Sequence, residues 1–275
     1  TSQGEDWFLH FQDKECYGRV VHLQPVTWKD NWPVMGIDKD GDYCGDPVLK
    51  FRKPKTAAPV VITNPVESDE FNAPKLGLQW QWHANYDQKF GMPTAFGTYR
   101  IYTHKVSDNF VNLWEVPNLL LQKTPTDNFT ATAKIRFTSK DQNQLGGIIM
   151  MGLDYSALVV KRVGDEFQLQ QITCHGADKG KKEDVKVLAT LKPTAKDKID
   201  YQPAIHEDIY LRMIVNNGKC RFAYSKNGKK YEAVGEEFKM REGKWIGAKI
   251  GFVAIEPAGK ANRGWVDADW FRVTK

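Results

Sequence analysis

The sequence predicts an all-β protein, most of which forms an antiparallel β-sandwich. Apolar and polar residues alternate strictly from Phe129 to Phe137, as in a strand with one buried face. Asn-Gly pairs at Asn217-Gly218 and Asn227-Gly228 supply tight turns between further runs of this kind. No long segment has helical periodicity, and no strand–helix–strand rhythm is present. These observations favour a sandwich or barrel over an α/β fold.

The clearest hairpin follows the alternating run that ends at Val215. Ile209, Leu211, Met213 and Val215 alternate with polar residues, Asn217-Gly218 reverses the chain, and the pattern resumes from Cys220 to Tyr224. Other strand-like runs lie at 147–151, 157–163, 167–174, 250–255 and 265–273. We therefore expect a many-stranded sandwich in the second part of the chain.

A proline-rich segment separates this part from the first 55 residues. Pro54, Pro59 and Pro65 restrict the backbone there, which is typical of an extended linker. We assign the linker to residues 56–66 and the sandwich to residues 67–275.

Residues 1–55 contain only two or three candidate strands. Trp7–Gln12 and Arg19–Leu23 are the clearer ones, and Leu49–Phe51 is a weaker third. So few strands cannot enclose an independent core. We expect residues 1–55 to belong to a larger body that lies outside this chain.

Charge and composition argue against several classes of partner. The net charge of +5 is spread widely, and the densest basic run, 179–182, is followed at once by Glu183 and Asp184, so we expect no nucleic-acid partner. No apolar run reaches the length of a membrane span, and the first residues do not form a signal peptide, as in a mature or truncated chain. Four separated cysteines exclude a CxxC site but leave a Cys16–Cys44 bridge open.

Short motifs along the whole chain resemble glycoside hydrolase family 43, the β-xylosidase and α-L-arabinofuranosidase type. In the first part, the matching segments resemble the closing blade of the family's propeller, and they lie at 6–13, 17–25 and 31–34. In the second part, they look like its C-terminal concanavalin A-like module, and they lie at 76–82, 116–123, 152–155, 243–249 and 267–272.

The resemblance implies a concanavalin A-like jelly roll after the last-blade fragment of a five-bladed β-propeller. It implies the non-catalytic C-terminal portion of a hydrolase of xylose- or arabinose-containing plant polysaccharides, whose sandwich supports and shapes the propeller active site. The family's catalytic carboxylates belong to earlier blades, so none is assigned here and enzyme status stays open. The alternative is an autonomous, lectin-like carbohydrate-binding module that exposes Trp80, Trp82 or Trp114. Trp80 and Trp82 share a predicted strand face with Leu78, which favours a core position for both tryptophans.

Three residues are candidates for binding substrate. In related xylosidases, an arginine matching Arg19 reaches the sugar pocket, and a guanidinium can bind sugar hydroxyls and hold carboxylates ionised. His22 follows three residues later. The turn that holds Trp245 places an aromatic ring at the pocket mouth in some relatives, where it would stack on a sugar. The alternatives are a salt bridge for Arg19, a structural role for His22 and interdomain packing for Trp245.

Four carboxylates of the sandwich are candidates for a structural calcium site. Asp267 and Asp269 share one face of a predicted strand, at a spacing of about 6.5–7 Å between Cα atoms. That spacing also resembles the acid and base of an inverting hydrolase. Calcium ligation together with Asp69 and Glu70, or a role in a turn, fits them better. The acidic run Asp38–Asp42 lacks the pattern of an EF-hand and is assigned to a turn.

The inferred role also predicts partners and location. We expect an oligo- or polysaccharide of the xylan or arabinan type and the upstream propeller blades of the same protein. A periplasmic or secreted bacterial protein fits this role best, although the family also has cytoplasmic members.

Overall fold

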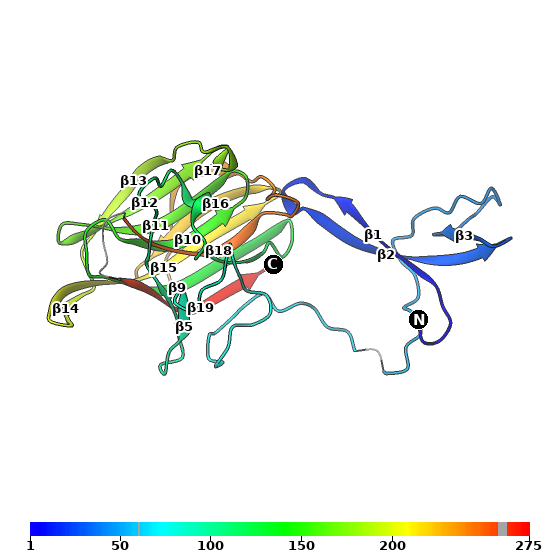
Figure 1. Cartoon of the computed structure of the whole chain (residues 1–275), viewed down its shortest axis with the longest axis horizontal. Helices are drawn as coiled ribbons and strands as arrows, with labels where there is room; N and C mark the ends of the chain where they lie inside the picture. The colour runs from blue at the N-terminus through cyan, green and yellow to red at the C-terminus, as the bar shows by residue number, and fades with distance from the viewer. Residues whose placement is uncertain (60, 258–262) are drawn as a thin grey trace. The chain divides into compact units, whose positions relative to one another are not determined.

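The computed structural model describes residues 1–59, 61–257 and 263–275 and divides the chain into two compact units (Figure 1). Unit 1 comprises Thr1–Lys14 and Arg19–Pro65, and unit 2 comprises Glu15–Gly18 and Val66–Lys275. Val60 of the predicted linker lies outside the described residues. The short segment Glu15–Gly18 thus belongs to unit 2, although its neighbours along the chain belong to unit 1.

Unit 1 contains a three-stranded antiparallel sheet in the order β1 (Trp7–Asp13), β2 (Arg19–Lys29) and β3 (Trp32–Met35). The two clearer strand predictions are confirmed. The weaker third prediction, at residues 49–51, was wrong, because Asp30 and Asn31 both adopt left-handed backbone angles and turn the chain straight back along β2. Asp and Asn tolerate these angles better than most residues.

Unit 2 is a sandwich of two eight-stranded sheets (Figure 1). The first sheet has the order β13-β12-β11-β10-β18-β8-β4, with β7 beside β18. Its strands are β4 (Gln81–Trp82), β7 (His104–Lys105), β8 (Leu120–Lys123), β10 (Leu145–Met151), β11 (Tyr155–Val163), β12 (Glu166–Cys174), β13 (Asp184–Leu191) and β18 (Lys249–Glu256).

The second sheet has the order β17-β16-β15-β9-β19-β6-β5, with β14 beside β15. Its strands are β5 (Gly91–Pro93), β6 (Tyr99–Tyr102), β9 (Asn128–Ser139), β14 (Ala195–Ile199), β15 (Gln202–Asn216), β16 (Lys219–Ser225), β17 (Glu232–Lys239) and β19 (Trp265–Thr274). The described residues of the unit also include the 3-10 turns η1 (Glu15–Tyr17), η2 (Leu113–Glu115) and η3 (Ala177–Lys179). The predicted all-β sandwich is confirmed.

Alternation along the strands of the second sheet separates its two faces. On β9, Ile135 and Phe137 are buried in the sandwich, while Lys134 and Arg136 point to the opposite, outer face. The first sheet differs, since a second apolar cluster around Leu113, Leu119 and Tyr155 also covers its outer face. The outer face of the second sheet is therefore the one on which charged side chains gather.

Aromatic rings fill one end of the core between the sheets. Trp80 is only 8% exposed, and its ring lies 5.3–5.7 Å from those of Phe71, Phe252 and Phe271. The core position predicted for Trp80 is confirmed. Leu78 does not share it, since it is fully exposed on a turn in which the Trp80 N–H donates to the Gly77 carbonyl.

The other two tryptophans of the carbohydrate-module alternative are half-buried. Trp82 packs against Phe90 with ring centroids 5.4 Å apart, and Trp114 packs against His83 at the same separation. Together with the buried Trp80, they form no open aromatic platform. The exposure on which that alternative depends is therefore missing at these three positions.

All four cysteines are free. Cys16 is buried in the core of unit 2, whereas Cys44 is exposed on unit 1. The Cys16–Cys44 bridge that the sequence left open is not formed. Among the described residues, no helix is long and apolar enough to cross a membrane.

A half-buried histidine makes the stability of the sandwich depend on pH. Burial, the nearby Lys249 ammonium and the Trp114 carbonyl act on His83, and burial dominates, so its pKa falls from 6.5 to about 4. The unfolded chain therefore binds a proton between these values that the folded chain does not, and stability is lost as the pH falls through this window. We expect this residue to lower the free energy of unfolding by about 2 kcal/mol between pH 7 and pH 5.

Urea denaturation of the chain and of His83→Gln at pH 7 and pH 5 measures this contribution. The glutamine can still bond to the Trp114 carbonyl but does not titrate, so its loss of stability should be smaller by that amount. Equal losses in the two proteins would contradict the assignment.

Candidate functional site

Trp245 lies on an exposed loop of unit 2 between β17 and β18. Its side chain is 72% exposed, and its backbone adopts a left-handed angle, φ 66°. A bulky residue at such an angle is strained, and strain of this kind persists only where the surroundings hold it. The structure therefore presents a large aromatic ring at the surface in a conformation that the loop alone would not favour.

Contacts at both ends of the loop hold it in place. At its start, the Leu153 N–H donates to the Glu242 carbonyl at 2.7 Å, and Arg241 Nη1 donates to Asp154 at 3.0 Å. Burial alone would raise the pKa of Asp154, but hydrogen bonds from His175, the Gly176 N–H and Arg241 lower it, so the carboxylate stays charged.

The other end of the loop rests on the segment Glu15–Gly18. The Ala248 N–H donates to the Cys16 carbonyl at 2.7 Å. A side chain at Gly247 would lie 2.4 Å from the Tyr17 carbonyl oxygen, so only glycine fits there. Sequence reasoning missed both sets of anchors, although the quoted motif 152–155 contains the first of them.

Arg19 and His22 both lie on β2 of unit 1, but they face opposite sides of the sheet. The pairing of β1 with β2 is regular, so residues three apart point in opposite directions. The Arg19 guanidinium lies 4.9 Å from the ring centroid of Phe11. The His22 ring stacks on His10, and its buried Nε2 has no hydrogen-bond partner among the described residues. The strand does not bring these two candidates together.

The four carboxylates predicted to hold calcium are engaged separately. Asp267 forms a bidentate pair with Arg100 at 2.7 and 2.8 Å, and Glu70 pairs in the same way with Arg272. Asp269 pairs with Lys134, and Asp69 accepts from Trp80 Nε1 and the Phe71 N–H, each at 2.8 Å.

In this structure the four carboxylates do not form one ligand set, because each has its own cation or donors. A shared ion would have to break three ion pairs. Calcium binding at these residues stays a prediction.

Among the described residues, three carboxylates approach one another in a different acidic group. Oxygens of Asp38, Asp40 and Asp42 lie within 4.8 Å. However, Asp38 accepts from Lys29 and from the Gly41 and Tyr43 N–H groups, which lowers its pKa to about 2. The group is a hydrogen-bonded turn, as expected from the sequence.

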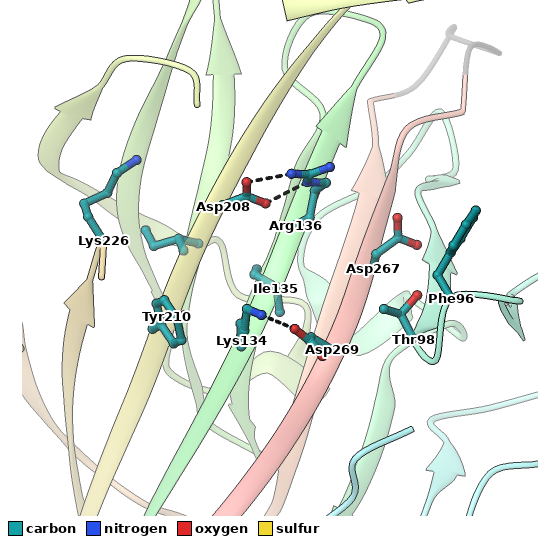
Figure 2. A pocket seen from close by; sticks show the side chains of 11 residues that line it. Phe96, Thr98, Lys134, Ile135, Arg136, Asp208, Tyr210, Lys226, Asp267 and Asp269 are labelled. Carbon is teal, nitrogen blue, oxygen red and sulfur yellow. Dashed lines mark hydrogen bonds and ion pairs between the residues drawn. The ribbon is translucent and has the colours of Figure 1, made fainter. Parts of the chain in front are cut away.

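Asp267 and Asp269 instead line a pocket on the outer face of the second sheet (Figure 2). The pocket has a volume of about 480 Å³. The side chains that line it come from β9, β15, β19, the turn before β6 and the turn after β16, and they are Phe96, Thr98, Lys134, Ile135, Arg136, Asp208, Ile209, Tyr210, Lys226, Asp267 and Asp269. Sequence reasoning singled out two of them, for a different purpose.

Curated relatives of this chain are glycosidases. A β-xylosidase of Formosa agariphila is 28% identical over 96% of this chain and 45% of its own length. The non-reducing end α-L-arabinofuranosidase BoGH43B of Bacteroides ovatus is 30% identical over 54% of this chain and 27% of its own length. The chain thus spans less than half the length of the curated relatives it matches.

Solved structures share the fold at low identity. The GH43 protein BlXynB of Bacillus licheniformis has a TM-score of 0.72 and 21% identity over 99% of this chain and 51% of its own. A xylan β-1,4-xylosidase of Bacillus halodurans has a TM-score of 0.75 and 17% identity over 100% of this chain and 52% of its own.

The family model described as the β-xylosidase C-terminal concanavalin A-like domain matches residues 68–274. The match covers nearly all of unit 2 and agrees with the resemblance to glycoside hydrolase family 43. Since it extends over most of the chain, this protein belongs to the family of β-xylosidase C-terminal concanavalin A-like domains.

Proposed function

We propose that this chain is the non-catalytic C-terminal portion of a hydrolase of xylose- or arabinose-containing plant polysaccharides. Upstream propeller blades would carry its catalytic carboxylates, and the sandwich would support and shape their pocket. The names of the curated relatives, β-xylosidase and α-L-arabinofuranosidase, support this class of substrate. One structural observation carries the proposal most directly, namely the exposed apolar face of unit 1.

That face lies on the pairing of β1 with β2. Leu9, Phe11 and Val21 share it and are 67%, 56% and 62% exposed within the chain. A three-stranded sheet has too little area to bury both of its faces, and a contiguous exposed apolar surface indicates a protein contact. Neighbouring blades of a propeller would cover such a sheet in the way that the proposal requires.

Two residues supply the proposed sugar contacts. Arg19 shares the apolar face with Leu9 and Phe11, so covering blades would take its charge out of water and strengthen its bonds to sugar hydroxyls or carboxylates. Trp245 would stack on a sugar ring and exclude water, as its exposed and strained presentation allows. The unpaired Nε2 of His22 is a further group that a hydroxyl could satisfy.

Activity assays with and without the upstream blades test the proposal. The protein that includes these blades should cleave aryl β-xylosides or aryl α-L-arabinofuranosides, and the 275-residue chain should not. A chain that cleaves them alone would contradict the proposal, as would an extended protein that cleaves neither. Cell fractionation tests the proposed periplasmic or secreted bacterial location, which predicts that the protein is found outside the cytoplasmic fraction.

Replacing Trp245 by alanine in the extended protein should lower kcat/KM by about 10- to 100-fold, because an ordered stacking surface worth about 1.4–2.7 kcal/mol is lost. Trp245→Phe should retain part of the activity. Tyr201→Ala is the matched control, since Tyr201 is also an exposed aromatic residue of unit 2 at a left-handed angle, φ 64°. If both alanine variants changed kcat/KM equally, Trp245 would have no specific role.

A further inference from the structure

We propose that the pocket on the outer face of the second sheet binds a neutral oligosaccharide (Figure 2). The side chains that line it combine fixed hydrogen-bonding groups with aromatic rings, and its volume of about 480 Å³ lies within the range of small-molecule sites. The family match concerns the fold and assigns no ligand to this face.

The floor of the pocket carries alternating charges on three neighbouring strands, and Arg100 on a fourth strand continues the row beyond the pocket lining. Asp208 of β15 lies opposite Arg136 of β9, which lies opposite Asp267 of β19, which lies opposite Arg100 of β6. Adjacent strands are ~4.8 Å apart, so the row extends for about 14 Å. It offers donors and acceptors in turn, and hydroxyl groups, which both donate and accept, match that order.

Ion pairs fix these groups and cancel their charges. Arg136 donates two bonds of 2.7 Å to Asp208, and Lys134 pairs with Asp269, as Figure 2 shows. Lys226, at the edge, pairs with the buried Glu207. Each cation thus has a carboxylate, and the pocket offers no excess charge to a nucleic acid or an acidic polymer. A neutral polar ligand fits this balance best.

Aromatic rings stand beside the charged row. Phe96, on the turn before β6, is 89% exposed at the pocket edge. On the other side, Tyr210 lies against Trp270, with ring centroids 5.9 Å apart. The apolar faces of sugar rings pack on such surfaces while their hydroxyls bond to polar groups, so a carbohydrate is the neutral ligand that uses both features.

The choice of a pentose sugar rests on the proposed function. The inference that the pocket binds a neutral oligosaccharide rests on its lining residues alone. If the whole protein degrades xylan or arabinan, a site for a neutral pentose chain on the sandwich would hold polymer close to the enzyme and raise its effective concentration. Xylohexaose and arabinohexaose are therefore the first probes.

Calorimetric titration of the 275-residue chain with these two sugars, and with hexagalacturonate as a charged comparison, tests the inference. At least one neutral sugar should bind with a Kd between about 10 μM and 1 mM. Raising the salt from about 50 to 500 mM should change this Kd by less than about twofold, because a neutral sugar carries no charge whose attraction to the pocket salt could screen. No saturable binding up to about 10 mM, or tighter binding of hexagalacturonate, would overturn it.

Variants locate the bound sugar. Phe96→Ala and Arg136→Met should each weaken binding by about tenfold or more, which corresponds to ~1.4 kcal/mol. Tyr201→Ala, a control outside the pocket lining, should leave the Kd unchanged, and circular dichroism confirms that each variant folds. Unchanged binding in folded Phe96→Ala and Arg136→Met would overturn the assignment to this pocket.

The two proposals can fail separately. An extended protein that cleaves aryl pentosides, together with a 275-residue chain that binds neither sugar, would refute this inference alone. A chain that binds a neutral sugar through Phe96 and Arg136, together with an extended protein that cleaves no pentoside, would refute the proposed function alone.

Discussion

Replacing Trp80 by alanine is expected to lower the free energy of unfolding of the sandwich by about 4 kcal/mol. The indole is 8% exposed and packs among Phe71, Phe252 and Phe271, so its removal leaves a cavity between the two sheets. The variant also removes the Nε1 donor that bonds to Asp69 at 2.8 Å. Both losses act on the same part of the core.

Urea denaturation followed by circular dichroism measures this effect. Two control variants separate the loss of packing from the loss of the hydrogen bond and from an exposed substitution nearby. Trp80→Phe keeps an aromatic ring but loses the donor, so it should destabilise by less than the alanine variant. Leu78→Ala removes a fully exposed side chain two residues away and should stay within about 0.5 kcal/mol of the wild type. A loss below about 1 kcal/mol in Trp80→Ala would contradict a core role and revive a sugar-binding role for this indole.

The long strands of the sandwich could be predicted because alternation and burial agree along them. On β9 and β15, every second residue enters the core, and the turn Asn217-Gly218 adopts the left-handed angles that its residue types favour. By contrast, β14 is mostly exposed and shows no apolar alternation, because an edge strand of this kind is held by pairing with a neighbour. β13 is also mostly exposed, but its apolar residues recur at every second position from Val185 to Leu191, so its sequence could have predicted that strand.

The residues of the candidate site also fall into those that the sequence could predict and those that it could not. Motif resemblance could find Arg19 and Trp245, and the period of two could have shown that Arg19 and His22 face opposite sides of β2. The partners of the carboxylates could not be found, because they come from distant segments. Arg100 and Asp267 are 167 residues apart along the chain, and pairing across strands alone brings them together. The charged row on the outer face was missed for this reason.

Arg19→Ala, in the protein that includes the upstream blades, is expected to lower kcat/KM for aryl β-xylosides by about 10² to 10³-fold, or about 3–4 kcal/mol. A guanidinium that touches the sugar or a catalytic carboxylate acts through its fixed fork of donors. Arg19→Lys keeps the charge but not the fork, and it should therefore recover only part of this loss.

A purely structural Arg19 would behave differently, and three measurements separate the two roles. If Arg19 contacts substrate, added guanidinium ion should restore part of the activity of Arg19→Ala, and the unfolding midpoint should change little. Arg52→Ala is the matched control in unit 1, because Arg52 pairs with Glu5 and lies 5.9 Å from the Trp7 ring centroid. It should keep kcat/KM within about threefold of wild type. If Arg19→Ala lost stability without a specific loss of kcat/KM, Arg19 would be a residue that packs against the neighbouring blades. The proposed contact with the sugar would then depend on Trp245 and on the result of its own alanine variant.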